Sequence, residues 1–156
     1  MNNTAIFPGS FDPITIGHKS LILRTYELFD KIFIAIGNNS EKKNSFSIEE
    51  RINWIKETFE GFEKIEVAVY EGLTVDFCKT VGAKYIIRGV RTAADFEFEK
   101  GIAQINRKIS GIETIILFSE PEYSHISSSV VREIYKYGGD ISQFVPENII
   151  EMIKQR

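Results

Sequence analysis

The sequence predicts an α/β fold: a single doubly wound domain in which a five-stranded parallel sheet carries helices on both faces. Five short apolar segments recur along the 156 residues, and segments of helical spacing lie between them. Most connecting loops are short, as in repeated strand–helix–strand units. No repeat, low-complexity stretch or linker divides the chain, so residues 1–156 are expected to form one Rossmann-like domain.

The first half of the chain supplies two of these strands and two helices. Residues 4–7 and 31–36 are apolar runs, and an unbroken run is typical of a parallel strand buried on both faces. Ser47 and Glu50 form a capping box at the start of a helix that Gly61 ends. The helix after the first strand is expected to have an apolar face made of Leu21, Ile22, Thr25, Leu28 and Phe29.

The second half completes the pattern. Its apolar segments predict strands over residues 65–70, 85–87 and 114–118. Its helices are expected over residues 75–80, 92–109, 127–137 and from Pro146, which suits a first helical position. The helix over residues 92–109 has an apolar seam of Ile102, Ile105 and Ile109.

Composition excludes several classes of protein. The net charge of −3 is unlike the basic field that general nucleic-acid binding requires, so no nucleic-acid partner is expected. Cys78 is the only cysteine, which rules out an intramolecular disulfide and the spacing of a zinc finger. No apolar run approaches the roughly 20 residues of a membrane span, and no signal peptide is recognisable. The sequence therefore predicts a cytoplasmic protein without a membrane partner.

The segment from Phe7 to His18 draws most attention as a candidate site. It joins the first strand to the first helix through two glycines and two prolines, which allow a sharp turn and then hold it. A turn of this kind presents the free N–H groups of a helix N-terminus to an anion such as phosphate. Neither of the standard phosphate patterns, GxGxxG or GxxxxGK[ST], is present in it.

This segment also resembles a known family. Residues 9–13, Gly-Ser-Phe-Asp-Pro, followed by Thr15-Ile16-Gly17-His18, are similar to the signature of nucleotidyltransferases with a [HT]xGH motif, and most similar to the phosphopantetheine adenylyltransferases. Residues 87–91 and 94–99 resemble that family's IRGxR…ADFxYE block, with Phe98 in place of its tyrosine. Residues 126–129 match its ISSS block, although Tyr123 and His125 stand where many relatives have Trp and Phe.

The resemblance implies a function. Members transfer the adenylyl group of ATP to 4′-phosphopantetheine and form dephospho-coenzyme A and pyrophosphate. It further implies Mg²⁺ bound with ATP, coenzyme A as a possible feedback ligand, and a homohexamer. The sequence contains no cluster of carboxylates that suggests a protein metal site. This is consistent with the preference of Mg²⁺ for substrate phosphates over a full protein cage.

The family's functional residues map onto this sequence position by position. His18 is expected to stabilise the transition state. The acceptor is expected to contact Ser10, Lys42, Thr74 and Arg88. The expected ATP-binding residues are Ser10, Phe11, His18, Gly89, Val90, Arg91, Glu99, Tyr123, Ser124, His125, Ile126, Ser127, Ser128 and Ser129.

Simpler interpretations stand beside these roles. His18 alone would be an ordinary helix-cap histidine, Ser10 a turn residue and Glu99 an exposed helix glutamate. Lys43 is as suitable as Lys42 by composition, and the tract at 127–129 is also a helix cap. Two other functions remain open: a nucleotidyltransferase with another acceptor, such as nicotinamide mononucleotide or glycerol phosphate, and a nucleotide-binding protein without turnover.

Overall fold

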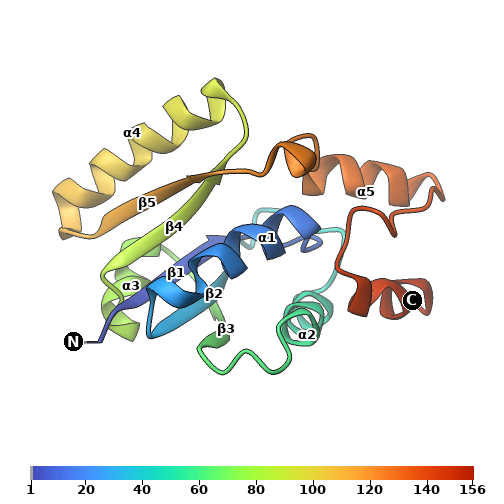
Figure 1. Ribbon diagram of the computed structural model, residues 1–156, viewed down its shortest axis with the longest axis horizontal. Coiled ribbons are helices and arrows are strands. Elements are labelled where there is room, and N and C mark those ends of the chain that lie inside the picture. Colours follow the sequence, from blue (N-terminus) through green and yellow to red (C-terminus); the bar gives the residue numbers. More distant parts are fainter. Residues whose placement is uncertain (1) are drawn as a thin grey trace.

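The structure, a computed structural model, describes residues 2–156 and has the predicted α/β architecture (Figure 1). All adjacent strands run parallel, in the order β3-β2-β1-β4-β5. The strands are β1 (Thr4–Gly9), β2 (Lys31–Gly37), β3 (Ile65–Tyr70), β4 (Tyr85–Val90) and β5 (Glu113–Phe118). The expected fold class is confirmed.

Helices cover both faces because the strand order reverses after β3, and right-handed crossovers then change face. The helices are α1 (Ile16–Thr25), α2 (Ile48–Thr58), α3 (Thr74–Val81), α4 (Ala93–Ser110), α5 (Ser128–Lys136) and α6 (Ile150–Lys154). The larger core joins one face of the sheet to α1, α2, α5 and α6 through side chains such as Ile22, Ile55, Val131 and Ile153. A smaller core, around Ile6, Val75 and Ile86, lies on the opposite face beneath α3.

The point where the order reverses lies between β1 and β4. Their pairing covers only Ala5 and Ile6 among the described residues, whereas β1 and β2 pair from Thr4 to Gly9. Pro8, which has no N–H to donate, therefore lies where β1 has already separated from β4. This divergence opens the sheet at the carboxyl ends of its central strands.

Several boundaries differ from the predicted ones. β4 continues beyond residue 87, so Arg88 and Gly89 lie within the strand. α1 ends at Thr25 and a 3₁₀ turn follows, which leaves Leu28 exposed although Phe29 is buried. Pro146 does not begin a helix: it caps a 3₁₀ turn over Glu147–Ile149, and α6 starts only at Ile150.

The predicted seam of α4 faces solvent. Ile105 is 62% exposed and Ile109 55%, and Phe98 on the same side is 68% exposed. We call Phe98, Ile102, Ile105 and Ile109 the α4 apolar stripe. Glu99 is the one buried residue of this helix. Within residues 2–156, none of the helices is long and apolar enough to cross a membrane.

Candidate active site

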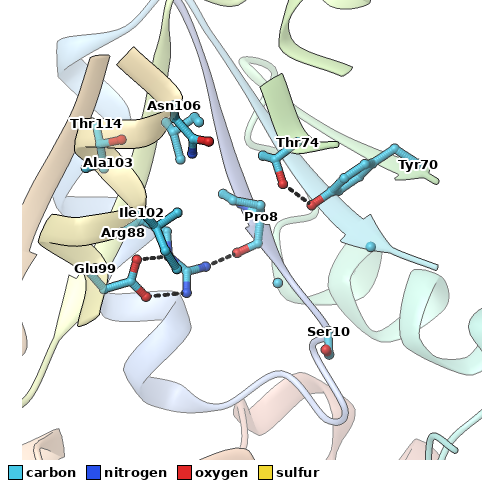
Figure 2. A pocket seen from close by; sticks show the side chains of 13 residues that line it. Pro8, Ser10, Tyr70, Thr74, Arg88, Glu99, Ile102, Ala103, Asn106 and Thr114 are labelled. Atoms are coloured by element: carbon cyan, nitrogen blue, oxygen red, sulfur yellow. Dashed lines mark hydrogen bonds and ion pairs between the residues drawn. The ribbon is translucent and has the colours of Figure 1, made fainter. Parts of the chain in front are cut away.

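Two cavities meet at the carboxyl ends of β1 and β4. The larger, of about 360 Å³, lies among the end of β1, the start of α1, the end of β4 and the start of α5. The smaller, of about 270 Å³, lies between α3 and α4 over the opposite face of the sheet (Figure 2). They share the wall residues Pro8, Gly9, Ser10, Arg88 and Glu99. Ligands in the two cavities would therefore lie against the same residues, among them Ser10 and Arg88.

His18 belongs to a capping box at the start of α1. Thr15 is the N-cap, and its side-chain oxygen accepts from the His18 N–H at 3.3 Å. The Thr15 N–H donates to His18 Nδ1 at 3.0 Å, so the imidazole stands where Glu or Gln completes an ordinary capping box. Because Nδ1 is an acceptor, the neutral ring carries its proton on Nε2. The cap thus sets both the orientation of the ring and its tautomer.

The electrostatic surroundings keep this ring neutral. Burial, together with the positive charges of Arg88 and Arg91, lowers the pKa of His18 from 6.5 to about 4. The Phe11 ring lies beside it, with centroids 5.0 Å apart. At neutral pH the cavity therefore holds a neutral N–H donor among cations, which suits the negative charge of a phosphate.

Arg88 is fixed on three sides, as Figure 2 shows. Its Nε and Nη2 donate to the two carboxylate oxygens of Glu99 at 3.0 and 2.6 Å, and its Nη1 donates to the Pro8 carbonyl at 2.7 Å. A guanidinium has five N–H groups, so two remain for a phosphate. Glu99 is consequently a buried anchor for Arg88 rather than the exposed helix glutamate of the simpler interpretation.

Gly89 allows α1 to approach the sheet. A Cβ at this position would lie 2.2 Å from Leu21 Cδ1. A larger residue would force the Leu21 side chain, which packs α1 on the sheet, to move. Gly89 therefore has a packing reason in addition to its predicted contact with ATP.

Lys42 and Ser10 form a second polar pair in the larger cavity. Lys42 Nζ donates to Ser10 Oγ at 2.7 Å, which joins the loop after β2 to the turn after β1. Ser10 lines both cavities. Of the two adjacent lysines, Lys42 is the one that lines the larger cavity.

The start of α5 closes the other side of that cavity. Ser127 is the N-cap and accepts from the Val130 N–H at 3.2 Å, as the simpler interpretation of this tract expects. Ser128 donates to the Pro13 carbonyl at 2.8 Å and so fixes α5 to the turn. Arg91 Nη1 donates to the Ile126 carbonyl at 3.2 Å and pairs with Asp95.

The structure brings most of the predicted residues together. Thr74 lies in the smaller cavity, where its hydroxyl is 2.8 Å from Tyr70 Oη. The larger cavity is lined by Ser10, Phe11, His18, Lys42, Arg88, Gly89, Arg91, Glu99, Tyr123, Ile126, Ser127, Ser128 and Ser129. The other predicted residues lie elsewhere: Val90 is buried in the protein, Ser124 donates to the Pro121 carbonyl, and His125 is exposed.

Arg132 is a cation of the larger cavity that sequence reasoning missed. Its Nη1 donates to the Asp12 carbonyl at 2.9 Å and its Nη2 to Ser129 Oγ at 3.1 Å. Its position four residues after Ser128 places it one helical turn into α5, and this spacing was the available signal.

Acidic residues near the cavities are already paired. Glu99 binds Arg88 and Asp95 binds Arg91. Among residues 2–156, no three His, Cys, Asp or Glu side chains form a group that could hold a metal ion.

Comparisons with known proteins identify the family of this chain. The cytidylyltransferase-like family profile matches residues 6–134. The phosphopantetheine adenylyltransferase of Flavobacterium psychrophilum is 56% identical over 145 residues, which cover 93% of this chain and 96% of that protein. The protein of the same name from Finegoldia magna is 44% identical and covers 100% of this chain, with 98% of its own length matched.

A solved structure supports the fold independently. The nicotinic acid mononucleotide adenylyltransferase of Plasmodium falciparum, complexed with NaAD, superimposes with a TM-score of 0.74 at 20% identity over 99% of this chain and 96% of that one. At 20% identity, this likeness supports the fold only. The family is shown by the relatives of 44% and 56% identity, which match nearly the whole chain. This chain belongs to the cytidylyltransferase-like family and, within it, to the phosphopantetheine adenylyltransferases.

Proposed function

We propose that this protein transfers the adenylyl group of ATP to 4′-phosphopantetheine, forming dephospho-coenzyme A and pyrophosphate in coenzyme A biosynthesis. The observation that carries the proposal is the shared wall of the two cavities. ATP would occupy the larger, cation-lined cavity, and the pantetheine arm would occupy the smaller one. The acceptor phosphate would then lie at Ser10 and Arg88, which belong to both.

The chemistry needs few groups from the protein. An oxygen of the acceptor phosphate attacks the α-phosphorus of ATP, a new P–O bond forms, and the bond to pyrophosphate breaks. The acceptor oxygen is already an anion, so no general base is required. The difficulty is to bring two anions together in line, which depends on positioning and on electrostatic stabilisation.

The cavity residues divide this work. Lys42 and Arg88 would neutralise and orient the acceptor phosphate. His18 Nε2–H would donate to a non-bridging oxygen of the α-phosphate, where negative charge grows in the transition state. Arg91 and the N-terminus of α5 would bind the departing pyrophosphate.

Magnesium is part of this proposal. The pairing of Asp95 and Glu99 with arginines fits a metal that arrives with ATP rather than one held by the protein. When bound, Mg²⁺ neutralises triphosphate charge and leaves the arginines to orient the phosphates.

One experiment tests the assignment. The protein is mixed with ATP, Mg²⁺ and 4′-phosphopantetheine, and the product is identified by mass. Dephospho-coenzyme A is expected, with one pyrophosphate released for each product molecule. Nicotinamide mononucleotide and glycerol 3-phosphate serve as parallel acceptors. Faster turnover of either one would assign a different acceptor, and intact ATP with every acceptor would indicate a binding protein without turnover.

Assembly into a homohexamer, feedback by coenzyme A and a cytoplasmic location complete the proposal. The α4 apolar stripe supports self-association, because four large apolar side chains on one helix face gain from burial against a second copy. Light scattering should give about six times the mass of the chain, and Ile105→Glu should lower the measured mass.

Coenzyme A, which contains the pantetheine arm, should compete with 4′-phosphopantetheine.

A further inference from the structure

Behind the Ser10–Lys42 pair lies a buried arginine that touches neither cavity. Arg51 belongs to α2 and is only 2% exposed. Its Nη1 donates to the Ser10 carbonyl at 2.9 Å, and its Nε donates to the Phe46 carbonyl at 3.1 Å. One guanidinium thus joins the turn after β1 to the loop after β2.

Asp12 makes the complementary connection. Its carboxylate, also 2% exposed, accepts from the N–H groups of Ser45 and Phe46, both at 2.9 Å. The peptide segment at 45–46 is therefore held through its N–H groups by the turn and through a C=O group by α2. Charge-assisted hydrogen bonds of this kind are stronger than neutral ones, and buried partners left unpaired are costly.

This network lies directly behind the groups that would bind the acceptor phosphate. Arg51 holds Ser10 by its carbonyl, and the Ser10 hydroxyl oxygen accepts a hydrogen bond from Lys42 Nζ at 2.7 Å. Lys42 lies three residues before the segment that Asp12 and Arg51 fix. Arg51 therefore connects α2 both to Ser10 and to the loop that carries Lys42.

We propose that Arg51 is a positioning residue for acceptor binding, a conclusion that rests on the function proposed above. It acts through Ser10 and the loop at 38–46 and makes no contact with ATP or acceptor. Loss of Arg51 should therefore weaken binding of 4′-phosphopantetheine selectively. The nucleotide side of the site depends chiefly on α1, β4 and α5, to which Arg51 donates no hydrogen bond.

The test compares Arg51→Met with Thr58→Val, a matched control in the same helix. Thr58 is equally buried, and its hydroxyl donates only to the Trp54 carbonyl, at 2.6 Å. Arg51→Met should raise the KM for 4′-phosphopantetheine roughly 10- to 100-fold, with the Kd for ATP within about threefold. Thr58→Val should lower the melting temperature without changing either constant.

Amide hydrogen exchange gives a readout that does not depend on activity. Exchange at Ser45 and Phe46 should accelerate in Arg51→Met and stay unchanged in Thr58→Val. Arg51→Lys keeps the charge but lacks the planar guanidinium that bonds two carbonyls, so its acceptor KM and its exchange rates should lie between those of wild type and Arg51→Met. It replaces Arg51→Met in the test if that variant does not fold.

Two results would overturn the proposal: an unchanged acceptor KM in a folded Arg51 variant, or equal losses for ATP and acceptor. If the wild-type protein forms no dephospho-coenzyme A, the proposed function fails, whereas the exchange comparison still decides whether Arg51 holds the loop.

Discussion

The two walls of the larger cavity hold their cations in different ways. Arg88 lies on β4, in the central sheet, and three hydrogen bonds to Glu99 and Pro8 fix its guanidinium. Lys42 lies on the exposed loop after β2, and its side chain makes one hydrogen bond, to Ser10. The first wall is built in advance for one geometry. The second is fixed at residues 45–46, but the Lys42 side chain itself can adjust. A reaction between two anions benefits from both kinds of wall. The rigid wall orients the reacting phosphates, and the adjustable positive charge can follow a phosphate that moves during the reaction.

The largest effect should come from His18, which α1 places in the same cavity as the rigid wall formed by Arg88. His18→Ala removes the neutral N–H donor that the α1 cap aims into the cavity, and loss of one such donor lowers kcat roughly 10²- to 10³-fold. The Kd for ATP should change little, because the donor acts chiefly on charge that develops in the transition state.

Single-turnover rates and ATP titrations of the same sample measure the two quantities. His18→Gln, which keeps a neutral N–H group on a different side chain, should recover part of the rate. Equal losses in ATP binding and turnover would give His18 a ground-state role instead.

The next effect distinguishes a fixed cation from an adjustable one. Arg88→Lys keeps the charge but cannot bind both Glu99 oxygens and the Pro8 carbonyl while it reaches a phosphate. The KM for 4′-phosphopantetheine should rise roughly 10- to 100-fold. Steady-state kinetics with varied acceptor measure this change. Arg107→Lys is the control, since Arg107 is an exposed arginine that pairs with Glu113 at 2.8 Å. An unchanged acceptor KM would remove Arg88 from acceptor binding.

A third prediction concerns the proton on His18. Because the pKa in the folded protein is about 4 rather than 6.5, the unfolded chain binds more protons than the folded chain between these values. The free energy of unfolding should therefore rise with pH from about 4 to 6.5 and lose this dependence above 6.5. His18→Gln should lack this contribution.

Imidazole NMR measures the same pKa directly. The chain has two histidines, so a His125→Gln variant assigns both sets of signals. The His18 signals should move near pH 4, with Nε2 protonated and Nδ1 bare above it. A midpoint near 6.5 would contradict the effect of burial and of the two arginines on the pKa, and a proton on Nδ1 would contradict the capping-box geometry.

The fold and part of the site could be predicted because their signals are local in sequence. Unbroken apolar runs marked the parallel strands, and their carboxyl ends converge at one edge of any such sheet. Hydrophobic spacing also predicted α2 and α4, but it could not say what covers each face. Ile55 of α2 is fully buried, whereas Ile105 of α4 is 62% exposed. Spacing identifies an apolar face, and only the three-dimensional packing shows whether the same chain covers it.

The connections between site residues could not be predicted, because they join segments far apart in sequence. Glu99 was expected at the ATP site, and the structure shows its carboxylate bound to Arg88. Arg51 gave no sequence signal beyond a place on an amphipathic helix, yet it meets Ser10, which lies 41 residues earlier. Sequence motifs therefore identify the residues that face a ligand, but they do not identify the residues that hold those side chains in place.

The smallest effect should come from the adjustable wall. Lys42→Arg keeps a positive charge on a loop that can accommodate a longer side chain, so the KM for 4′-phosphopantetheine should stay within about threefold of wild type. Lys42→Met, which removes the charge at similar length, should raise that KM roughly tenfold, the effect of losing one charge-assisted contact. Acceptor titrations at saturating ATP measure both variants alongside Arg88→Lys. If Lys42→Arg raised this KM as much as Arg88→Lys, the loop would be as rigid as the strand. The single side-chain hydrogen bond to Ser10 would then not account for how Lys42 is held.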